Sequence, residues 1–401
     1  MARSDDELIE YNDTMVTSRR KTQASHSANF KDFLLRDELN IAIQDAAFEH
    51  PSEVQQQCIP KAILGVDILC QAKSGTGKTG VFVISTLQQL KPIDNESSVL
   101  VIVHTKEMAY QIKEEYQRFI KPFNGVTVGV FYGGVDVEED IRRLNKGSPT
   151  VFIGTPGRTL DLLKRKEVSF RHVKHLVIDE CDQCITDLKL RRDIQEVLYR
   201  TPLEKQTMMF TATLNEESKA TCLLFLNNPH EVYVGEESRL TLHGLTQGYL
   251  KVEETEKEKV LEDILDRYEN INQCVIFVKD KMRAKRLTRH LSKQGFPTID
   301  IHSGVPTKER LQRFNDFKER KYRMLVATDL MGRGIDIQDI NMVINYDMPE
   351  SAEAYLHRVG RAGRFETKGD SISFVSDESD SVVLNEVQKR FEVSIKDLKE
   401  Q

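Results

Sequence analysis

A glycine-rich stretch, AKSGTGKT, occupies residues 72–79. Glycines in such a loop let backbone N–H groups converge on phosphate oxygens, a lysine adds positive charge, and a threonine hydroxyl can bind magnesium. The alternative is an ordinary glycine-rich turn. It is disfavoured because an apolar run precedes the stretch and a helix-like segment follows it. The stretch predicts a phosphate-binding loop made by Ser74, Gly75, Thr76, Gly77, Lys78 and Thr79.

Acidic residues follow a second apolar run, in the sequence HLVIDECD at 175–182. A phosphate-binding loop needs a carboxylate at the end of a nearby strand to hold magnesium, and Asp179 has that place. Glu180 is then placed to orient or deprotonate an attacking water. Cys181 and Cys184 offer an alternative, half of a metal or redox site. A structural zinc usually needs two Cys-x-x-Cys pairs, and the other four cysteines are scattered singly. The magnesium and water site is therefore favoured.

A cationic cluster lies in the second half of the chain, in the sequence HRVGRAGR at 357–364. Such a cluster could be a solvated face, but Gly360 and Gly363 lower the helix propensity that a plain surface helix would need. The functional interpretation is that Arg361 and Arg364 reach the terminal phosphate across a cleft between two lobes. Arginines of this kind are worth about 10³–10⁵ in rate. Hydrolysis would then require the lobes to close.

The composition is that of a soluble globular protein. The chain has 401 residues, 39% hydrophobic and 30% charged, which predicts two domains because one core rarely serves more than about 300 residues. No apolar run approaches the ~20 residues of a membrane-spanning helix, and the N-terminal sequence lacks the apolar core of a secretory signal. The six cysteines are expected as reduced thiols in the cytosol or nucleus. The net charge of −6 leaves room for a local basic groove.

Short β-rich runs alternate with helix-like segments along the chain. One helix is expected within 106–120, where apolar residues recur every fourth position. Apolar strands that alternate with amphipathic helices predict an α/β fold with parallel sheets. The expected strands are 67–72, 98–105, 126–134, 150–156, 175–182 and 206–213, then 273–279, 297–304, 323–329, 341–349 and 370–376.

The alternation pauses once, in a polar stretch with three glycines at 234–248. We expect a linker at 235–247, between a first domain at 30–234 and a second at 248–401. Residues 1–29 are polar and are expected to be flexible. Ligands of open α/β sheets bind beyond the carboxyl ends of the strands, so the chemistry should lie there.

The ordered set of motifs resembles that of the DEAD-box RNA helicases of superfamily 2. In chain order the motifs are FEHPSEVQQ, AKSGTGKT, HTKEMA, GG, TPGR, DECD, TAT, VIFVK, HSG, ATDLMGRGID and HRVGRAGR, over roughly residues 30–376. A complete ordered set is far more specific than one motif. The resemblance implies two RecA-like domains, each a parallel sheet flanked by helices, joined by a flexible linker. It also implies RNA-stimulated hydrolysis of ATP with Mg²⁺.

The resemblance assigns roles at the ATP site. Phe48 would stack on adenine and Gln55 would read its edge, although Ser52 and Gln55 also fit a capping box at a helix start. The implied catalytic set is Lys78, Asp179, Glu180, Arg361 and Arg364, with the loop residues Ser74 to Thr79 at the phosphates, Gly334 and Asp336 at the ribose, and magnesium held by Thr79 and Asp179, partly through water.

The resemblance also assigns an RNA surface. Backbone amides, small hydroxyls and single basic residues suit phosphates and 2′-hydroxyls rather than base edges, so salt-sensitive binding without sequence preference is expected. TPGR alone would be an ordinary Pro-Gly turn. The implied RNA contacts are Thr105, Gly134, Thr155, Pro156, Gly157, Arg158, Ser303, Gly304 and Thr328. Asp182, Thr211, Thr213 and His357 would couple the ATP site to this surface.

Three positions depart from the commoner family pattern. Lys106 stands where the family usually has arginine, which keeps the charge but loses the bidentate fork, so its RNA contact should be weaker. Thr211 replaces serine and keeps the hydroxyl. Cys181 replaces alanine, which gives DECD.

DECD, together with NYDMPESAEAYLHRVGRAGRF and RFEVSI, resembles the subgroup that acts in nuclear pre-mRNA splicing and mRNA export as the core ATPase of the TREX complex. The partners implied are single-stranded RNA or a short duplex, mRNA-export adaptors, TREX components and spliceosomal proteins. We expect a monomer without membrane contact, in the nucleus, that can shuttle to the cytoplasm. The alternatives are a cytoplasmic helicase of the translation-initiation type and a non-catalytic RNA clamp or scaffold.

Overall fold

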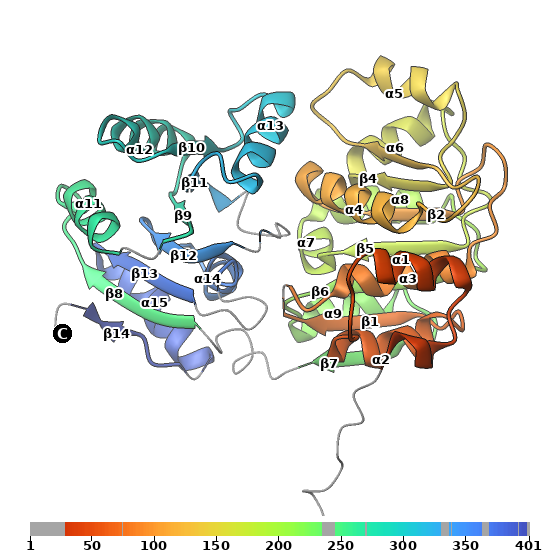
Figure 1. Ribbon diagram of the computed structural model, residues 1–401, viewed down its shortest axis with the longest axis horizontal. Coiled ribbons are helices and arrows are strands. Elements are labelled where there is room, and N and C mark those ends of the chain that lie inside the picture. Colours follow the sequence, from red (N-terminus) through yellow and green to blue (C-terminus); the bar gives the residue numbers. More distant parts are fainter. Residues whose placement is uncertain are drawn as a thin grey trace, which may run out of the picture.

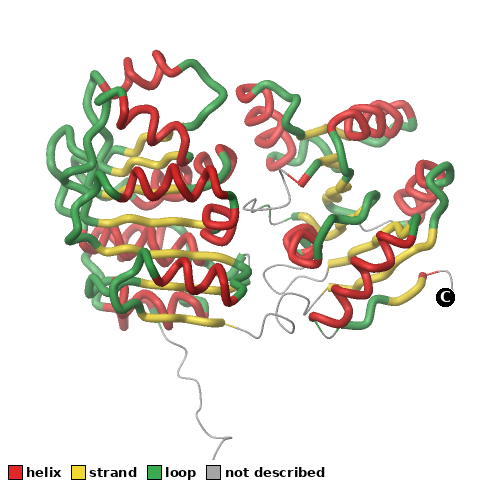
Figure 2. Tube along the Cα trace, turned by 180° about the vertical axis from the view of Figure 1, so that it is seen from behind, coloured by secondary structure: helices red, strands yellow, loops and turns green. Residues whose placement is uncertain are grey.

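Two lobes stand side by side, each with a parallel sheet covered by helices on both faces (Figures 1 and 2). This arrangement agrees with the expected pair of RecA-like domains. All of the predicted N-terminal segment except Asn29, and most of the predicted linker, lie outside the described residues. The computed structural model describes residues 29–73, 75–234, 245–268, 271–329, 337, 339–362, 369–391 and 393–398.

The first lobe holds a seven-stranded sheet in the order β3-β4-β2-β5-β6-β1-β7. Its strands are β1 (Ile68–Ala72), β2 (Val99–Ile102), β3 (Val128–Phe131), β4 (Val151–Gly154), β5 (His175–Asp179), β6 (Gln206–Thr211) and β7 (His230–Val234). Its helices are the 3-10 helix η1 (Phe30–Phe33), α1 (Asp37–Asp45), α2 (Glu53–Ala62), α3 (Lys78–Gln89), α4 (Lys106–Phe119), α5 (Val137–Leu144), α6 (Pro156–Lys164), α7 (Cys181–Thr186), α8 (Leu188–Leu198) and α9 (Glu216–Leu223).

The second lobe holds another seven-stranded sheet, in the order β10-β11-β9-β12-β13-β8-β14. Its strands are β8 (Leu245–Lys251), β9 (Gln273–Phe277), β10 (Thr298–Ile301), β11 (Met324–Ala327), β12 (Ile340–Asn345), β13 (Gly369–Val375) and β14 (Lys396–Asp397). Its helices are α11 (Lys257–Arg267), α12 (Lys281–Lys293), α13 (Thr307–Lys318), α14 (Ala352–Val359) and α15 (Glu378–Arg390). None of the helices described in either lobe is both long and apolar enough to span a lipid bilayer.

The strands are continuous apolar runs because each sheet is buried on both faces. In β2, Val99 and Val101 pack into a core beneath helices α1 to α4, whereas Leu100 and Ile102 pack into a second core beneath α5 to α9. Successive side chains of a strand point to opposite faces, so one short run serves two cores. The same arrangement fixes the direction in which every strand-end loop leaves the sheet.

Three strands were not expected from the sequence. Strands β7 and β14 lie at sheet edges, where exposed positions interrupt the apolar pattern. Strand β8 begins at Leu245, three residues inside the stretch predicted as linker, and only Gln247 and Gly248 of its seven residues are buried. Its place is fixed by pairing along the whole of β13. Backbone pairing of this kind leaves little trace in composition.

Residues that follow strand ends of the first lobe touch the second lobe. Lys106, which follows β2, donates from Nζ to Thr307 Oγ1 at 2.5 Å. Thr213, which follows β6, has its Oγ1 3.2 Å from His357 Nε2. The carboxyl ends of the first sheet therefore face the second lobe, and the expected ligand edge lies at the interface.

Replacing Phe210 with alanine should destabilise the first lobe by about 3–5 kcal/mol, because a fully buried ring that packs 5.4 Å from the ring of Phe82 would leave a cavity. Hydrogen exchange across a denaturant series reports the lobes separately. The matched change Phe277→Ala, in the separate core of the second lobe, should weaken that lobe instead. If each change lowered the stability of both lobes equally, the two cores would not be independent.

Candidate functional site

The predicted phosphate-binding loop connects β1 to α3. Gly75 and Gly77 have φ of 80° and 88°, the left-handed region that suits glycine. A Cβ on Gly77 would also lie 2.6 Å from Gln55 Nε2. Lys78 is buried and donates from Nζ to the backbone oxygens of Ala72 at 2.5 Å and Lys73 at 2.9 Å. The loop therefore places a lysine and the N-terminus of a long helix together, a combination suited to phosphate. Ser74 lies outside the described residues.

A cavity of about 580 Å³ opens in front of this loop. It is large enough for a nucleotide, and both lobes line it. The second lobe contributes Lys318, Ile337 and Asp339. The residues from the prediction that line it are Phe48, Gln55, Gly75, Gly77, Lys78, Thr79, Asp179 and Glu180. Thr76 does not, because its hydroxyl donates to Lys73 O at 2.7 Å within the loop.

Two buried carboxylates end strand β5 at the cavity wall. Burial, and then the neighbouring charge of Glu180, raise the pKa of Asp179 to about 7. Glu180 adopts φ 50° and ψ 50°, and its Oε2 is buried without a hydrogen bond to any described residue. Burying charged carboxylates costs free energy unless a cation or a water binds them. The set therefore fits magnesium, held by Asp179 with the hydroxyl of Thr79, and a water held by Glu180.

Cys181 and Cys184 are not paired with each other in the described structure. Cys181 Sγ lies 3.8 Å from Cys222 Sγ, so its sulfur neighbour comes from α9 rather than from the Cys-x-x-Cys. Burial raises the pKa of the Cys184 thiol, which disfavours the reactive thiolate. The described residues contain no cluster of three or more metal-ligating side chains. The acidic magnesium and water site stays the preferred prediction.

Gln55, which lines the cavity, forms the capping box that was considered for it. Its Oε1 accepts from Ser52 N at 3.0 Å, and its backbone N–H donates to Ser52 Oγ at 3.3 Å, which is the capping box. Its Nε2 donates to Gly77 O at 3.2 Å, which ties α2 to the phosphate loop. Phe48 lies beside it, with the guanidinium of Arg118 5.3 Å from the ring centroid. Adenine recognition by Phe48 and Gln55 stays a prediction, and Arg118 is an addition that the motifs did not indicate.

The four predicted coupling residues meet in one network. Asp182 accepts from Thr211 Oγ1 at 2.9 Å and from Thr213 Oγ1 at 3.0 Å. Thr213 Oγ1 also lies 3.2 Å from His357 Nε2 of the second lobe. A hydroxyl has one proton, so Thr213 donates to the carboxylate and accepts from the Nε2–H of His357. The network thus joins the DECD strand end to α14 of the other lobe.

Arg361 lies one turn beyond His357 and is 2% exposed. Its Nε donates to His357 O at 3.0 Å, and it lines a small cavity with Lys73 of the phosphate loop and Thr213. Arg361 thus lies near the phosphate loop but does not line the large cavity, and its contact with the phosphates stays a prediction. The other predicted nucleotide contacts of the second lobe, Gly334, Asp336 and Arg364, lie outside the described residues.

The predicted RNA residues follow the ends of neighbouring strands. Thr105 caps α4 after β2, Gly134 follows β3 with φ 85°, and Thr155 begins α6 after β4 with Pro156 and Gly157 in its first turn. Strands β3, β4 and β2 are adjacent in the sheet. In the second lobe Ser303 and Gly304 are exposed after β10 and Thr328 follows β11, also adjacent strands. All but Arg158 thus stand at strand ends as backbone or small polar groups.

Arg158 is not placed to touch a surface ligand. Its guanidinium is 7% exposed and pairs with the buried carboxylate of Asp140, while its NH2 donates to Val135 O at 2.5 Å. The RNA contact expected of Arg158 is not supported by this placement. The side chain instead fixes the loop after β3 that carries Gly134. A basic residue in a motif does not reveal whether a carboxylate from another helix neutralises it.

Contacts between α4 and α13 were missed by sequence reasoning. Arg310 Nε donates to Glu107 Oε1 at 2.6 Å, and this pair is buried. Lys106 Nζ donates to Thr307 Oγ1, which in turn donates to Gly134 O at 3.1 Å. Lys106 therefore contacts the second lobe, a role that its place in HTKEMA did not indicate. No local pattern marks partners about 200 residues apart.

Comparisons with known proteins agree on the family. Residues 52–221 match the model described as DEAD/DEAH box helicase, and residues 256–366 match the helicase conserved C-terminal domain. The chain is 55% identical to DEAD-box ATP-dependent RNA helicase 56 of Oryza sativa subsp. japonica, over 94% of this chain and 87% of that protein. It is 54% identical to DEAD-box ATP-dependent RNA helicase 15 of Arabidopsis thaliana, over 94% and 88%.

A solved structure shares the arrangement of both lobes. S. cerevisiae Dbp5 bound to RNA and ADP BeF3 matches with a TM-score of 0.85 and 28% identity, over 92% of this chain and 95% of that one. Dbp5 has also been solved bound to Gle1 and IP6, with a TM-score of 0.76, 28% identity, and coverage of 92% and 94%.

Replacing Thr213 with valine should lower the RNA-stimulated rate of ATP hydrolysis about two- to thirtyfold, because it removes the hydroxyl that bridges Asp182 and His357. ATP binding should persist, since Thr213 does not line the large cavity. Steady-state kinetics with and without RNA measures both. Thr213→Ser keeps the bridge and is the control. Equal kinetics for the two variants would contradict the coupling role.

Proposed function

The chain belongs to the DEAD-box family of ATP-dependent RNA helicases, and on that premise we propose that it remodels RNA–protein complexes in the nucleus, in pre-mRNA splicing and mRNA export. One observation carries the enzymatic part. The cavity that holds the phosphate loop and the acids of DECD is lined by side chains of both lobes. Bound ATP can therefore change how the lobes sit, and RNA that spans both lobes can change the ATP site.

Each predicted catalytic group has a step that it can perform. Lys78 and the N–H groups at the start of α3 bind the phosphates. Glu180 has an oxygen without a hydrogen bond from any described residue, and it is positioned to hold a water and accept its proton. Arg361 lies beside the phosphate loop and can stabilise charge that develops on the terminal phosphate. Magnesium bound at Thr79 and Asp179 would neutralise phosphate charge.

The nuclear role rests on sequence detail. DECD and the C-terminal sequences resemble the splicing and export subgroup, and Cys181 is accommodated against Cys222 in the core. The solved complex of Dbp5 with Gle1 supports the idea that a two-lobe ATPase of this shape takes a protein partner. We extend this to the chain and propose export adaptors, TREX components and spliceosomal proteins as partners. Recovery of such proteins with the chain from nuclear extract tests the role, and recovery of translation-initiation factors alone would favour the cytoplasmic alternative.

Glu180→Gln should lower RNA-stimulated ATP hydrolysis by about 10²–10⁴-fold, because an amide cannot accept the proton of the attacking water. ATP and RNA should still bind, since the shape of the side chain is kept. Phosphate release and RNA binding by the purified chain measure the two effects. Glu204→Gln, on an exposed loop, is the matched control and should behave as the unsubstituted chain. RNA binding without hydrolysis in the unsubstituted chain would favour the clamp alternative or a need for a partner.

A further inference from the structure

The two sheets have the same strand order. Each strand of the second lobe corresponds to the first-lobe strand whose number is seven lower. Strand β8 thus corresponds to β1, and β12 to β5. In the first lobe the helix after β1 begins at Lys78, and β5 ends at Asp179. In the second lobe the helix after β8 begins at Lys257, and Asp347 follows the end of β12 by two residues. A lysine and an aspartate therefore occupy matching places in both lobes.

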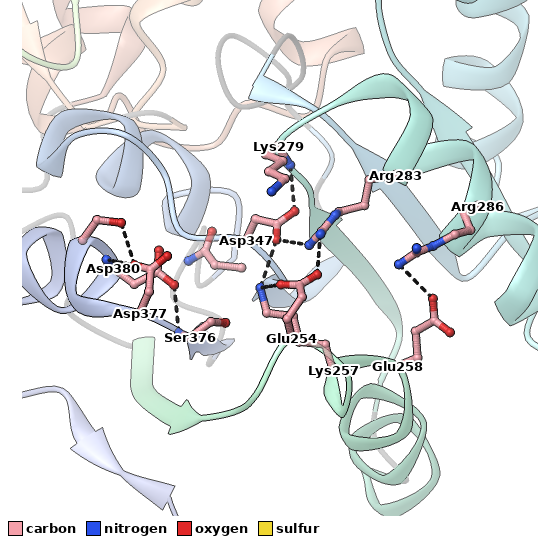
Figure 3. Close-up of polar contacts among 12 residues, drawn as sticks. Glu254, Lys257, Glu258, Lys279, Arg283, Arg286, Asp347, Ser376, Asp377 and Asp380 are labelled. Atoms are coloured by element: carbon pink, nitrogen blue, oxygen red, sulfur yellow. Dashed lines mark hydrogen bonds and ion pairs between the residues drawn. The ribbon is translucent and has the colours of Figure 1, made fainter.

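The second pair is held within the protein rather than facing a ligand cavity (Figure 3). Lys257 Nζ lies 3.0 Å from Asp347 Oδ1 and 3.0 Å from Glu254 Oε2. Arg283 contacts the same two carboxylates, with its NH1 2.5 Å from Asp347 Oδ1. The backbone N–H of Lys279 donates to Asp347 Oδ2 at 2.9 Å. Two cations meet two carboxylates, and Lys257 and Asp347 are 3% and 7% exposed, so the charge of the amine is already balanced by carboxylates of the protein.

Asp347 links this network to helix α14. Its backbone oxygen accepts from Arg358 NH1 at 2.7 Å. Arg358 is 1% exposed. Its Nε and NH2 donate to Asp329 Oδ1 and Oδ2, at 2.5 and 2.8 Å. The same helix carries His357, and Arg361 follows it. The side chain of Asp347 is therefore fixed by cations while its main chain fixes the helix that reaches the first lobe.

We propose that Lys257, Arg283 and Asp347 are positioning residues for ATP hydrolysis. They hold the loop after β12 in one place, and Arg358 seats α14 against that loop. His357 then meets Thr213, and Arg361 lies beside the phosphate loop. None of the three touches the nucleotide cavity. The inference rests on the role proposed for Arg361.

Ion pairs hold the loop after β12 in one position more strictly than apolar packing would. A buried carboxylate that accepts from an amine, a guanidinium and a backbone N–H has one favourable orientation, whereas an apolar side chain has several. Removing one partner leaves an uncompensated buried charge, which is strongly unfavourable. The aromatic ring of Tyr346 contributes to this positioning, because the cationic groups of Lys257 and Arg283 lie 5.4 and 5.7 Å from its centroid. The loop is thereby held from several directions.

The helix α12 supplies a matched pair of variants. Arg283 belongs to the network, whereas Arg286 makes an exposed pair with Glu258 at 3.2 Å and does not reach Asp347 (Figure 3). Arg283→Met should lower the RNA-stimulated kcat about two- to thirtyfold with the KM for ATP unchanged. Arg286→Met should leave both unchanged. Rates are compared at a temperature where circular dichroism shows each variant fully folded. Equal kcat for the two variants would overturn the proposal.

A double-mutant cycle separates positioning from general weakening. If Arg283 acts through α14, Arg283→Met should cost little more kcat in a chain that already carries Arg361→Lys. Losses that multiply would overturn the positioning role. Lys257→Arg, which keeps the charge, should retain more kcat than Lys257→Met, and equal losses would count against the network. Full activity of Arg361→Lys alone would overturn the role of Arg361, whereas full activity of Arg283→Met overturns only the positioning role.

Discussion

The hydroxyl of Thr213 is hydrogen-bonded to both lobes. It donates to Asp182, at the strand end that carries the catalytic acids, and accepts from His357 of the other lobe. One proton shared in this way makes the bond directional, so the hydrogen bonding of the acidic strand end depends on where α14 lies. Asp182 lies three residues after Asp179, so this contact joins the acidic strand end of the first lobe to α14 of the second.

Buried charge is used differently in the two lobes, although their sheets have the same strand order. In the first lobe Lys78 donates to backbone oxygens, and Glu180 has an oxygen that no described residue hydrogen-bonds. These groups can therefore take further charge and hydrogen-bond partners, and a nucleotide and a metal ion can provide them. In the second lobe Lys257 is satisfied by Asp347 and Glu254. The first arrangement suits binding, and the second suits rigidity.

Contacts across the cleft combine these two uses. The ion pair between Glu107 and Arg310 is buried. Such pairs contribute little net free energy to folding, because removing both charges from water offsets their attraction. Their value is in orientation, since the pair forms only when α4 and α13 face one another correctly. Lys106 and Gly134, both at predicted RNA-facing loops, are held by Thr307 in the same region. The predicted RNA surface and the lobe interface are therefore built from the same loops.

The sequence by itself determined the fold class, eleven of the strands, the phosphate loop and the acids, because apolar runs, glycine turns and strand-end carboxylates are local features. It did not determine β7, β8 and β14, whose places depend on pairing with distant strands. Nor did it show that Asp140 neutralises Arg158, or that Arg310 meets Glu107 across 203 residues. Charges and hydrogen bonds act over a few ångströms in space, and only the tertiary structure decides which distant residues come that close.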